Sequence, residues 1–326
     1  MVCQVQEGSD PKGEGEEMKG FDVVGIGYTC VDLLGIAPKY PPDADEKTEL
    51  LEFSMQGGGP AATGLVTLSR LGVKTAFITK IGDDFFGRFA LEELRREGVD
   101  VSGAVIERGA SSPFAFIIVE RGTGRRTILW TRATTSQLRP EEVDMQLATS
   151  GRMLYLDGLQ MEASLQAAKL AKERDVIVFL DADTVQEGID ELIKLCDVVI
   201  ASRAFAREFT GCDGDYEKAL RSILSLGPRI AGITLGERGC ICSDGRRVVF
   251  KEAFKVDVVD TTGAGDVFHG AFAYGVLRGW DLESIAEFSN ATAALKCRKL
   301  GGRPGIPTLE EVLDFLGWEG EPSSRS

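Results

Sequence analysis

Short apolar runs alternate with helix-forming stretches along most of this chain, and that order restricts the folds open to it. Runs of this length suit buried strands, and the stretches between them are long enough for helices. Strands that alternate with helices build a mostly parallel sheet whose two faces are covered, so we expect an α/β protein. The expected strands are residues 21–27, 75–80, 153–156, 176–180, 198–200 and 230–234, and the expected helices are residues 59–71, 86–97, 160–173, 187–195, 203–210 and 215–226.

Two segments depart from this alternation. Residues 33–53 hold short extended pieces around several prolines. The β-type runs 114–119 and 127–130 flank a glycine-containing turn, which predicts a β-hairpin. We find neither an internal repeat nor an interdomain linker, so we expect one domain over residues 21–316 with extra strands beside its main sheet.

Composition argues against several classes of protein. The net charge of −14 disfavours a nucleic-acid surface, which needs a basic patch. No apolar run reaches the roughly 20 residues that span a bilayer, and the charged start lacks the apolar core of a signal peptide, so we expect a cytoplasmic protein with no membrane partner. Seven cysteines without a CxxC pair, and one histidine, predict reduced thiols instead of a disulfide framework or a zinc centre. The polar ends, residues 1–20 and 317–326, predict disordered tails.

Residues 260–266, Asp-Thr-Thr-Gly-Ala-Gly-Asp, give the strongest indication of chemistry. The β-type run 254–259 predicts a strand before them, and the apolar run 267–276 predicts a helix after them. The first amides of a helix lack intrahelical partners and carry the positive end of its dipole, so they favour an anion. Glycines at 263 and 265 let that anion approach the backbone. A carboxylate beside a phosphate site makes sense if Asp266 takes the proton of a hydroxyl that attacks the phosphate.

Several motifs in a fixed order resemble the ribokinase (PfkB) family of carbohydrate kinases, over about residues 21–316. They are the glycine-rich residues 57–64, the Ile-Gly-Asp-Asp-Phe-Phe-Gly segment 81–87, and residues 260–266. Segments such as 301–307 look closest to the sulfofructose kinase branch. The resemblance implies a ribokinase-like three-layer fold with a small β lid. The lid is expected from about 33–56 and 112–132.

The resemblance also implies roles for particular positions. Asp266 is the expected general base, and the amides of Gly263, Ala264 and Gly265 are expected to hold the transferring phosphate. The other implied positions are Asp32, Gly57 and Gly58 for the sugar, Thr234, Gly236 and Gly239 for the nucleotide phosphates, Asn290 for the adenine pocket, and Asp260 with the Thr262 carbonyl for a monovalent cation such as K⁺.

Simpler interpretations stand beside three of these roles, and one further residue has two interpretations. Asp32 and Asp260 are also suited to capping a loop or turn, and Asn290 to a helix surface. His269, three residues after Asp266, either shapes the acceptor pocket or is a hydrogen-bonded core histidine, and we favour the second.

The chain departs from the family pattern at four positions. Ser202 and Phe205 stand where a typical member has the Asn and Glu associated with magnesium, so Mg²⁺ is expected to arrive with ATP. Cys30 and Ala62 replace asparagines, which argues against a copy of the ribose site.

We therefore predict an ATP-dependent carbohydrate kinase that phosphorylates a primary hydroxyl. The sequence leaves open a nucleoside or phosphosugar kinase, and a relative that binds without catalysis. The expected partners are a small sugar substrate and ATP, together with a homodimer formed through the exposed edge of the lid. The sugar itself is not identified by these motifs.

Overall fold

The computed structural model describes residues 20–43, 45, 47–122 and 126–323 of the 326-residue chain. The predicted N-terminal tail lies outside the described residues apart from Gly20, as do the last three residues of the predicted C-terminal tail. No helix in the described ranges is both long enough and apolar enough to cross a membrane.

The main sheet is mostly parallel, as the sequence predicts. Its order is β14-β13-β12-β11-β10-β9-β1-β4, and only the pairings of β13 with its two neighbours are antiparallel. Next to the edge strand β4, Gly25 of β1 lies between Phe77 of β4 and Tyr155 of β9. The strands are β1 (Val23–Ile26), β4 (Thr75–Ile78), β9 (Met153–Leu156), β10 (Ile177–Ala182), β11 (Val198–Ser202), β12 (Ile230–Thr234), β13 (Cys240–Ser243) and β14 (Val248–Lys251).

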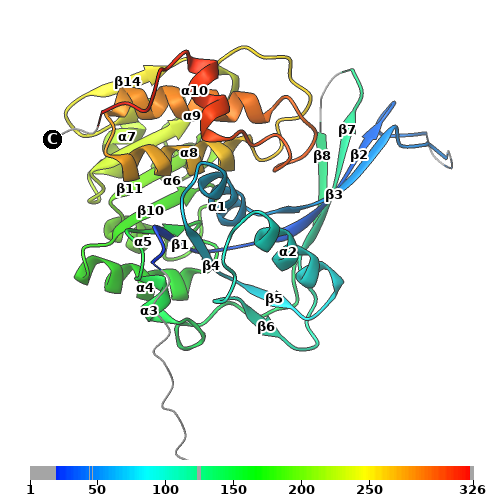
Figure 1. Ribbon diagram of the computed structural model, residues 1–326, viewed down its shortest axis with the longest axis horizontal. Coiled ribbons are helices and arrows are strands. Elements are labelled where there is room, and N and C mark those ends of the chain that lie inside the picture. The colour runs from blue at the N-terminus through cyan, green and yellow to red at the C-terminus, as the bar shows by residue number, and fades with distance from the viewer. Residues whose placement is uncertain (1–19, 44, 46, 123–125, 324–326) are drawn as a thin grey trace, which may run out of the picture.

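Helices cover both faces of this sheet and make it the middle layer of three (Figure 1). Successive strand residues point to opposite faces. Thus Phe179 belongs to one buried cluster and its neighbour Val178 to the other. The first cluster takes residues from α1 (Pro60–Arg70), α2 (Phe85–Arg96), α8 (Ala264–Arg278), α9 (Leu282–Lys296) and α10 (Leu309–Leu316). The second takes them from α3 (Met145–Ala148), α4 (Met161–Glu173), α5 (Ile189–Leu195), α6 (Arg203–Thr210) and α7 (Tyr216–Leu224).

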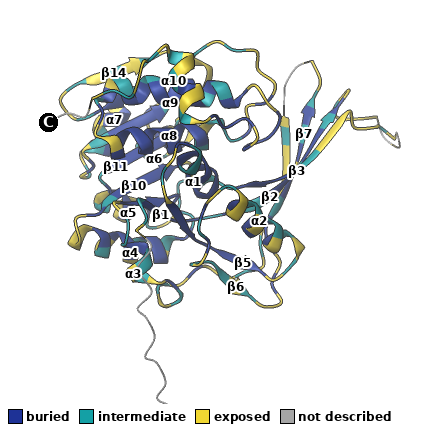
Figure 2. Cartoon of the chain, viewed as in Figure 1, coloured by how far each residue is buried: buried dark blue, intermediate teal, exposed yellow. Residues whose placement is uncertain are grey.

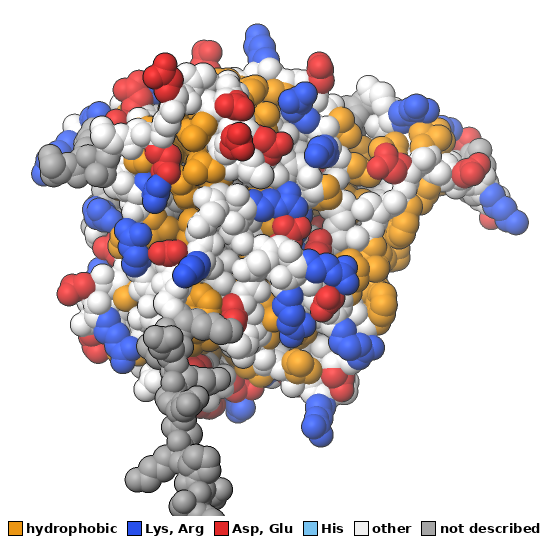
Figure 3. Space-filling model, viewed as in Figure 1, with side chains coloured by type: hydrophobic (Ala, Val, Ile, Leu, Met, Phe, Trp, Pro, Cys, Tyr) orange, Lys and Arg blue, Asp and Glu red, His pale blue; other side chains and the backbone are white. Residues whose placement is uncertain are grey.

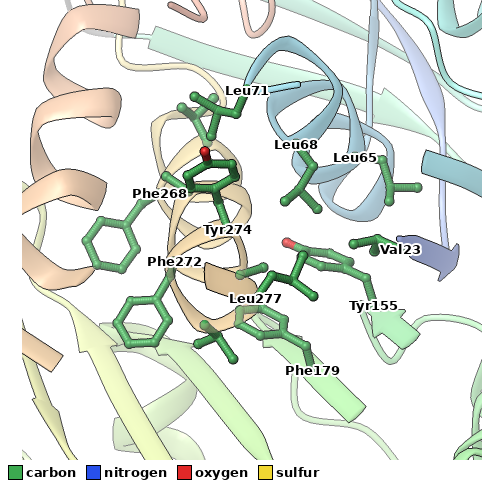
Figure 4. Packing of buried hydrophobic residues seen from close by; sticks show 14 of the residues in the cluster. Val23, Leu65, Leu68, Leu71, Tyr155, Phe179, Phe268, Phe272, Tyr274 and Leu277 are labelled. Carbon is green, nitrogen blue, oxygen red and sulfur yellow. The ribbon is translucent and has the colours of Figure 1, made fainter. Parts of the chain in front are cut away.

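Large side chains fill the space between α8 and the sheet. Figure 4 shows Phe268 and Phe272 on one side of α8, and Tyr155 and Phe179 of the strands on its other side. The rings of Tyr155 and Phe179 stack with centroids 5.0 Å apart. This packing makes α8 one of the most buried elements of the chain, as the dark blue of Figure 2 shows. The start of α8 is therefore held firmly against the sheet.

A second sheet of four strands stands out from one side of the body (Figure 1). Its order is β3-β2-β7-β8, with β2 and β7 parallel and the outer pairs antiparallel. The hairpin expected in this region is formed by β7 and β8, whose connecting residues 123–125 lie outside the described residues. The strands are β2 (Cys30–Ala37), β3 (Glu52–Gly58), β7 (Phe114–Glu120) and β8 (Arg126–Thr131).

Two strand predictions need correction. The strand expected at 75–80 is divided at Thr79, because β5 (Lys80–Gly82) leaves the main sheet to pair with β6 (Val105–Glu107). The strand expected at 254–259 does not form. The main sheet ends at β14, so this segment has no strand beside it, and Val258 stays 59% exposed. Its last amide, that of Val259, donates to the Cys297 carbonyl at 2.9 Å.

Candidate active site

Polar residues lie at the carboxyl ends of the parallel strands. In open α/β sheets this edge is where ligands bind. Asp181 is the second-last residue of β10, Ser202 ends β11 and Thr234 ends β12. The second turn of α8 meets this edge, because His269 of α8 pairs with Asp181. The glycine turn before α8 and the strand ends therefore belong to one region.

The turn at the start of α8 forms an open cradle of backbone amides. Gly263 is the N-cap residue and has φ +71°, a left-handed conformation that favours glycine. No side chain caps this end of the helix. A Cβ at Gly263 would lie 3.0 Å from the Gly302 Cα, whereas a Cβ at Gly265 would meet nothing within 4 Å. The Ala264 amide donates to the Thr261 carbonyl at 3.2 Å. The start of the helix and the open space at Gly265 are therefore the features that fit an anion such as a phosphate.

Asp266 lies in the first turn of α8 and is partly buried. Burial, followed by the nearby Asp181 carboxylate, raises the pKa of Asp266 to about 7, while His269 opposes this rise. A carboxyl group with a pKa near neutrality accepts a proton more readily than an ordinary aspartate. This property matches the predicted role of a base.

A buried polar cluster lies one helical turn behind Asp266. His269 Nδ1 is 2.5 Å from Asp181 Oδ1, and the Tyr155 hydroxyl donates to Asp181 Oδ2 at 3.0 Å. Burial opposes a charge on His269, but Asp181 outweighs it and raises the pKa of His269. His269 is buried, as the favoured core interpretation expects, although among the described residues its ring nitrogens have only the ion-pair contact with Asp181 and no hydrogen bond of good geometry. A positive charge on His269 acts on Asp266 through their i, i+3 spacing.

The residues that are expected to bind the sugar also lie close to one another. Asp32 of β2 is buried, and burial raises its pKa to about 6, against the lowering effect of the Cys30 thiol and Arg303. Gly58, at the end of β3, pairs with Cys30, and a Cβ there would lie 2.4 Å from Asp32 Oδ2. The absence of a side chain at Gly58 therefore leaves room for the Asp32 carboxylate.

Arg303 was not identified from the sequence as a site residue. It is 1% exposed, and its guanidinium donates to Glu93 at 2.9 Å and to the Gly58 carbonyl at 2.9 Å. A Cβ at Gly57 would lie 2.2 Å from Arg303 Nη1, so this glycine is needed for packing. The buried arginine therefore holds the Gly58 backbone beside Asp32, where the sugar is expected. The signal was present as the Gly-Gly-Arg-Pro-Gly run at 301–305, but its partners are remote in sequence.

The residues that are expected to bind the nucleotide lie in a turn and on a helix. Gly236 and Gly239, in the turn between β12 and β13, have φ +63° and +92°. A Cβ at Gly239 would lie 1.9 Å from the Lys251 carbonyl, so backbone packing alone requires that glycine. Asn290 is buried on α9, and its Nδ2 donates to the carbonyls of Lys251 at 3.1 Å and Glu252 at 3.2 Å. Asn290 therefore supports the chain after β14, and its contact with adenine stays a prediction.

Ser202 and Phe205 do not fit a magnesium site. The Ser202 hydroxyl caps α6 by accepting from the Phe205 amide at 3.1 Å. Phe205 is fully buried and stacks on Phe209. Both side chains serve the helix and its core, so neither position offers an oxygen ligand to the ion.

The oxygens of Asp260 are also engaged. Oδ1 accepts from the Thr262 amide at 2.9 Å and the Thr262 hydroxyl at 2.8 Å, and Oδ2 accepts from the Gly301 amide at 2.8 Å. The Asp260 carbonyl accepts from Lys296 Nζ at 3.0 Å. Burial lowers the pKa of Lys296, and the Asp260 carboxylate opposes this effect. These contacts do not fit a monovalent cation bound through Asp260. Lys296 was not identified from the sequence as a residue of this region.

Comparison with known proteins gives a consistent result. The sequence profile of the pfkB family carbohydrate kinases matches residues 21–309. A 5-dehydro-2-deoxygluconokinase from Clostridium perfringens is 28% identical over 94% of this chain and 96% of its own length. Ribokinase from Thermotoga maritima is 28% identical and superposes with a TM-score of 0.78 over 91% of this chain and 99% of its own. Arabidopsis thaliana ribokinase, solved with ribose and ATP, is 21% identical and has a TM-score of 0.77 over 92% of this chain and 100% of its own.

Proposed function

Because this chain belongs to the pfkB family of carbohydrate kinases, we propose that it transfers the γ-phosphate of ATP to a primary hydroxyl of a sugar or sugar derivative. The observation that carries the proposal is the pairing of Asp266, whose pKa is raised to about 7, with the open amide cradle of Gly263 and Gly265. A base and an anion site side by side supply what phosphoryl transfer to an alcohol requires.

In this reaction Asp32 and the Gly57–Gly58 backbone orient the sugar. Asp266 takes the proton of the attacking sugar hydroxyl while the oxygen of that hydroxyl bonds to the γ-phosphorus of ATP. The bond between the γ-phosphorus and the β–γ bridging oxygen breaks, and that oxygen leaves with ADP. The amides of Gly263, Ala264 and Gly265 stabilise negative charge on the transferring group. Thr234, Gly236 and Gly239 hold the other phosphates, and Asn290 borders the adenine. Mg²⁺ carried by the nucleotide would neutralise phosphate charge.

The second sheet is proposed to act as a lid that excludes water from the reacting phosphate. Its outer face exposes Phe53, Phe116 and Leu129, and Figure 3 shows hydrophobic side chains along this flank. We propose that a second copy of the chain covers this face in a homodimer. Light scattering on the wild type and a Phe116→Asp variant tests this arrangement. A wild type that is monomeric at assay concentrations would exclude it.

The first test of the function is an ADP-release assay with Mg-ATP and a panel of acceptors. The panel contains ribose, fructose, sulfofructose, 5-dehydro-2-deoxygluconate, fructose phosphates and nucleosides. Turnover on one acceptor that is lost in Asp266→Asn would support the proposal and identify the acceptor, including the sulfofructose branch, which stays a prediction. Turnover on a nucleoside or phosphosugar would favour those alternatives. Thermal stabilisation by ATP without product from any acceptor would favour a relative that only binds.

A further inference from the structure

Lys296 is a charged side chain in an unusual place. It ends α9 with 0% of its surface exposed, whereas lysines are almost never fully buried unless they are paired. Its Nζ donates to the Asp260 carbonyl at 3.0 Å, three residues before the N-cap of α8. The ammonium group therefore points at the backbone of the loop that leads into the phosphate cradle.

This loop depends on contacts with the end of α9. Because no strand forms over 254–259, no sheet pairing fixes the backbone there. Instead, the amides of Val259 and Asp260 both donate to the Cys297 carbonyl, at 2.9 and 3.2 Å. The Gly301 amide binds the Asp260 carboxylate from the same side. The end of α9 and the residues after it thus hold the loop that carries Gly263.

Two features offset part of the cost of burying the charge of Lys296, whose pKa is lowered by burial. The C-terminal end of a helix carries partial negative charge, and Lys296 lies in the last turn of α9. The carboxylate of Asp260 is buried beside it and interacts with it electrostatically. Arg126 of β8 reaches the same loop through the Thr261 hydroxyl, but Arg126 is exposed and belongs to the protruding sheet. Among these groups, Lys296 is the buried cation.

We propose that the ammonium group of Lys296 takes the place of a monovalent cation beside the 260–263 loop, so that this chain needs no added K⁺ or Na⁺. A bound ion would compete for the carbonyl and carboxylate oxygens of Asp260 that Lys296, Thr262 and Gly301 already use. The tethered ammonium supplies the positive charge and a directed hydrogen bond together. The part of this inference that concerns turnover rests on the proposed kinase activity.

The first test compares the wild type in chloride buffers of K⁺, Na⁺ and the bulky cation N-methyl-D-glucamine. We expect turnover and melting temperature to be the same in all three. Several-fold activation of the wild type by K⁺ over N-methyl-D-glucamine would overturn the proposal.

The second test uses Lys296→Met, which keeps the length of the side chain and removes its charge. We expect turnover in N-methyl-D-glucamine to fall about tenfold or more, the scale of losing a hydrogen bond from a charged group, and to recover in part with K⁺. The melting temperature of the variant should also rise with K⁺, a readout that does not depend on turnover. Lys299→Met makes the same change at an exposed position three residues away and should behave as the wild type does.

Two outcomes separate this proposal from a purely structural lysine. Loss of activity and stability in Lys296→Met that no monovalent cation restores would overturn it. If Lys296→Met does not fold, Lys296→Gln is compared in the same three salts, and a melting temperature independent of K⁺ would likewise overturn it. If the wild type lacks kinase activity, the melting experiments still decide the cation question.

Discussion

Asp266 should lower the stability of the protein at neutral pH, and the cost can be estimated. Burial and Asp181 raise the pKa of Asp266 from 3.8 to about 7. Below about pH 4 the folded and unfolded states both bind the proton, so the group contributes nothing. Between about pH 4 and 7 the folded state binds more protons than the unfolded state, and the free energy of unfolding falls as pH rises. About three pKa units correspond to about 4 kcal/mol, which partial exposure reduces to about 2–4 kcal/mol.

The substitution Asp266→Asn removes this penalty while keeping the shape of the side chain. At about pH 8 we expect the free energy of unfolding to rise by about 2–4 kcal/mol, and at about pH 4 by less than about 1 kcal/mol. Turnover should fall about 100-fold or more, because the variant has no base. The protein would thus gain stability as it loses function.

Urea denaturation at the two pH values measures this effect. Trp280 is a suitable fluorescent probe, because it is 5% exposed and packs against Phe288 and Trp318. Asp257→Asn, an exposed carboxylate in the preceding segment, is the matched control and should change stability little at either pH. A variant at Asp266 that is no more stable than the wild type at about pH 8, or that gains equally at about pH 4, would refute the reasoning.

Three further predictions follow from the same geometry. kcat/KM should increase with pH through about pH 7 as Asp266 loses its proton. His269→Gln should shift this increase to higher pH, because the pKa of Asp266 rises when a positive neighbour is lost; an unchanged pH profile would contradict the electrostatic role of His269. Gly57→Ala would place a Cβ 2.2 Å from Arg303 Nη1, so KM for the sugar should rise while KM for ATP changes little; steady-state kinetics would show equal effects if the reasoning fails. Asn290→Ala removes a buried side-chain amide that donates to two part-buried carbonyls, so it should cost about 1–3 kcal/mol in urea denaturation, a loss that a merely exposed helix residue would not cause.

Local signals predicted the elements that lie next to one another in the sequence. The alternation of apolar runs and helices indicated the parallel sheet, and the glycines before Val267 indicated the helix start that places Asp266. The same reasoning failed at 254–259, where β-type residues have no neighbouring strand to pair with. Strand propensity describes a residue's fit to a sheet and cannot show whether the sheet extends that far.

Long-range contacts explain what the sequence analysis missed. Arg303 binds a carbonyl at Gly58, and Lys296 binds one at Asp260, and neither partner lies near in the chain. A lysine on a helix is usually exposed, so its type gave no reason to expect burial. The backbone contacts of Asn290 were missed for the same reason, because its partners come from another element.

Two strands of the protruding sheet, β2 and β3, also carry the residues that are expected to bind the sugar. Asp32 lies in β2, and Gly57 and Gly58 end β3, in the paired stretch nearest the body. The sheet therefore has no separate hinge between its tip and the groups that would grip the sugar. Force applied to the sheet at one end is transmitted along a continuous hydrogen-bonded ladder to the other. Closing over the ligand and tightening the contacts with its hydroxyls would then be one mechanical event, so a sugar that fits Asp32 poorly would also leave the site open to water.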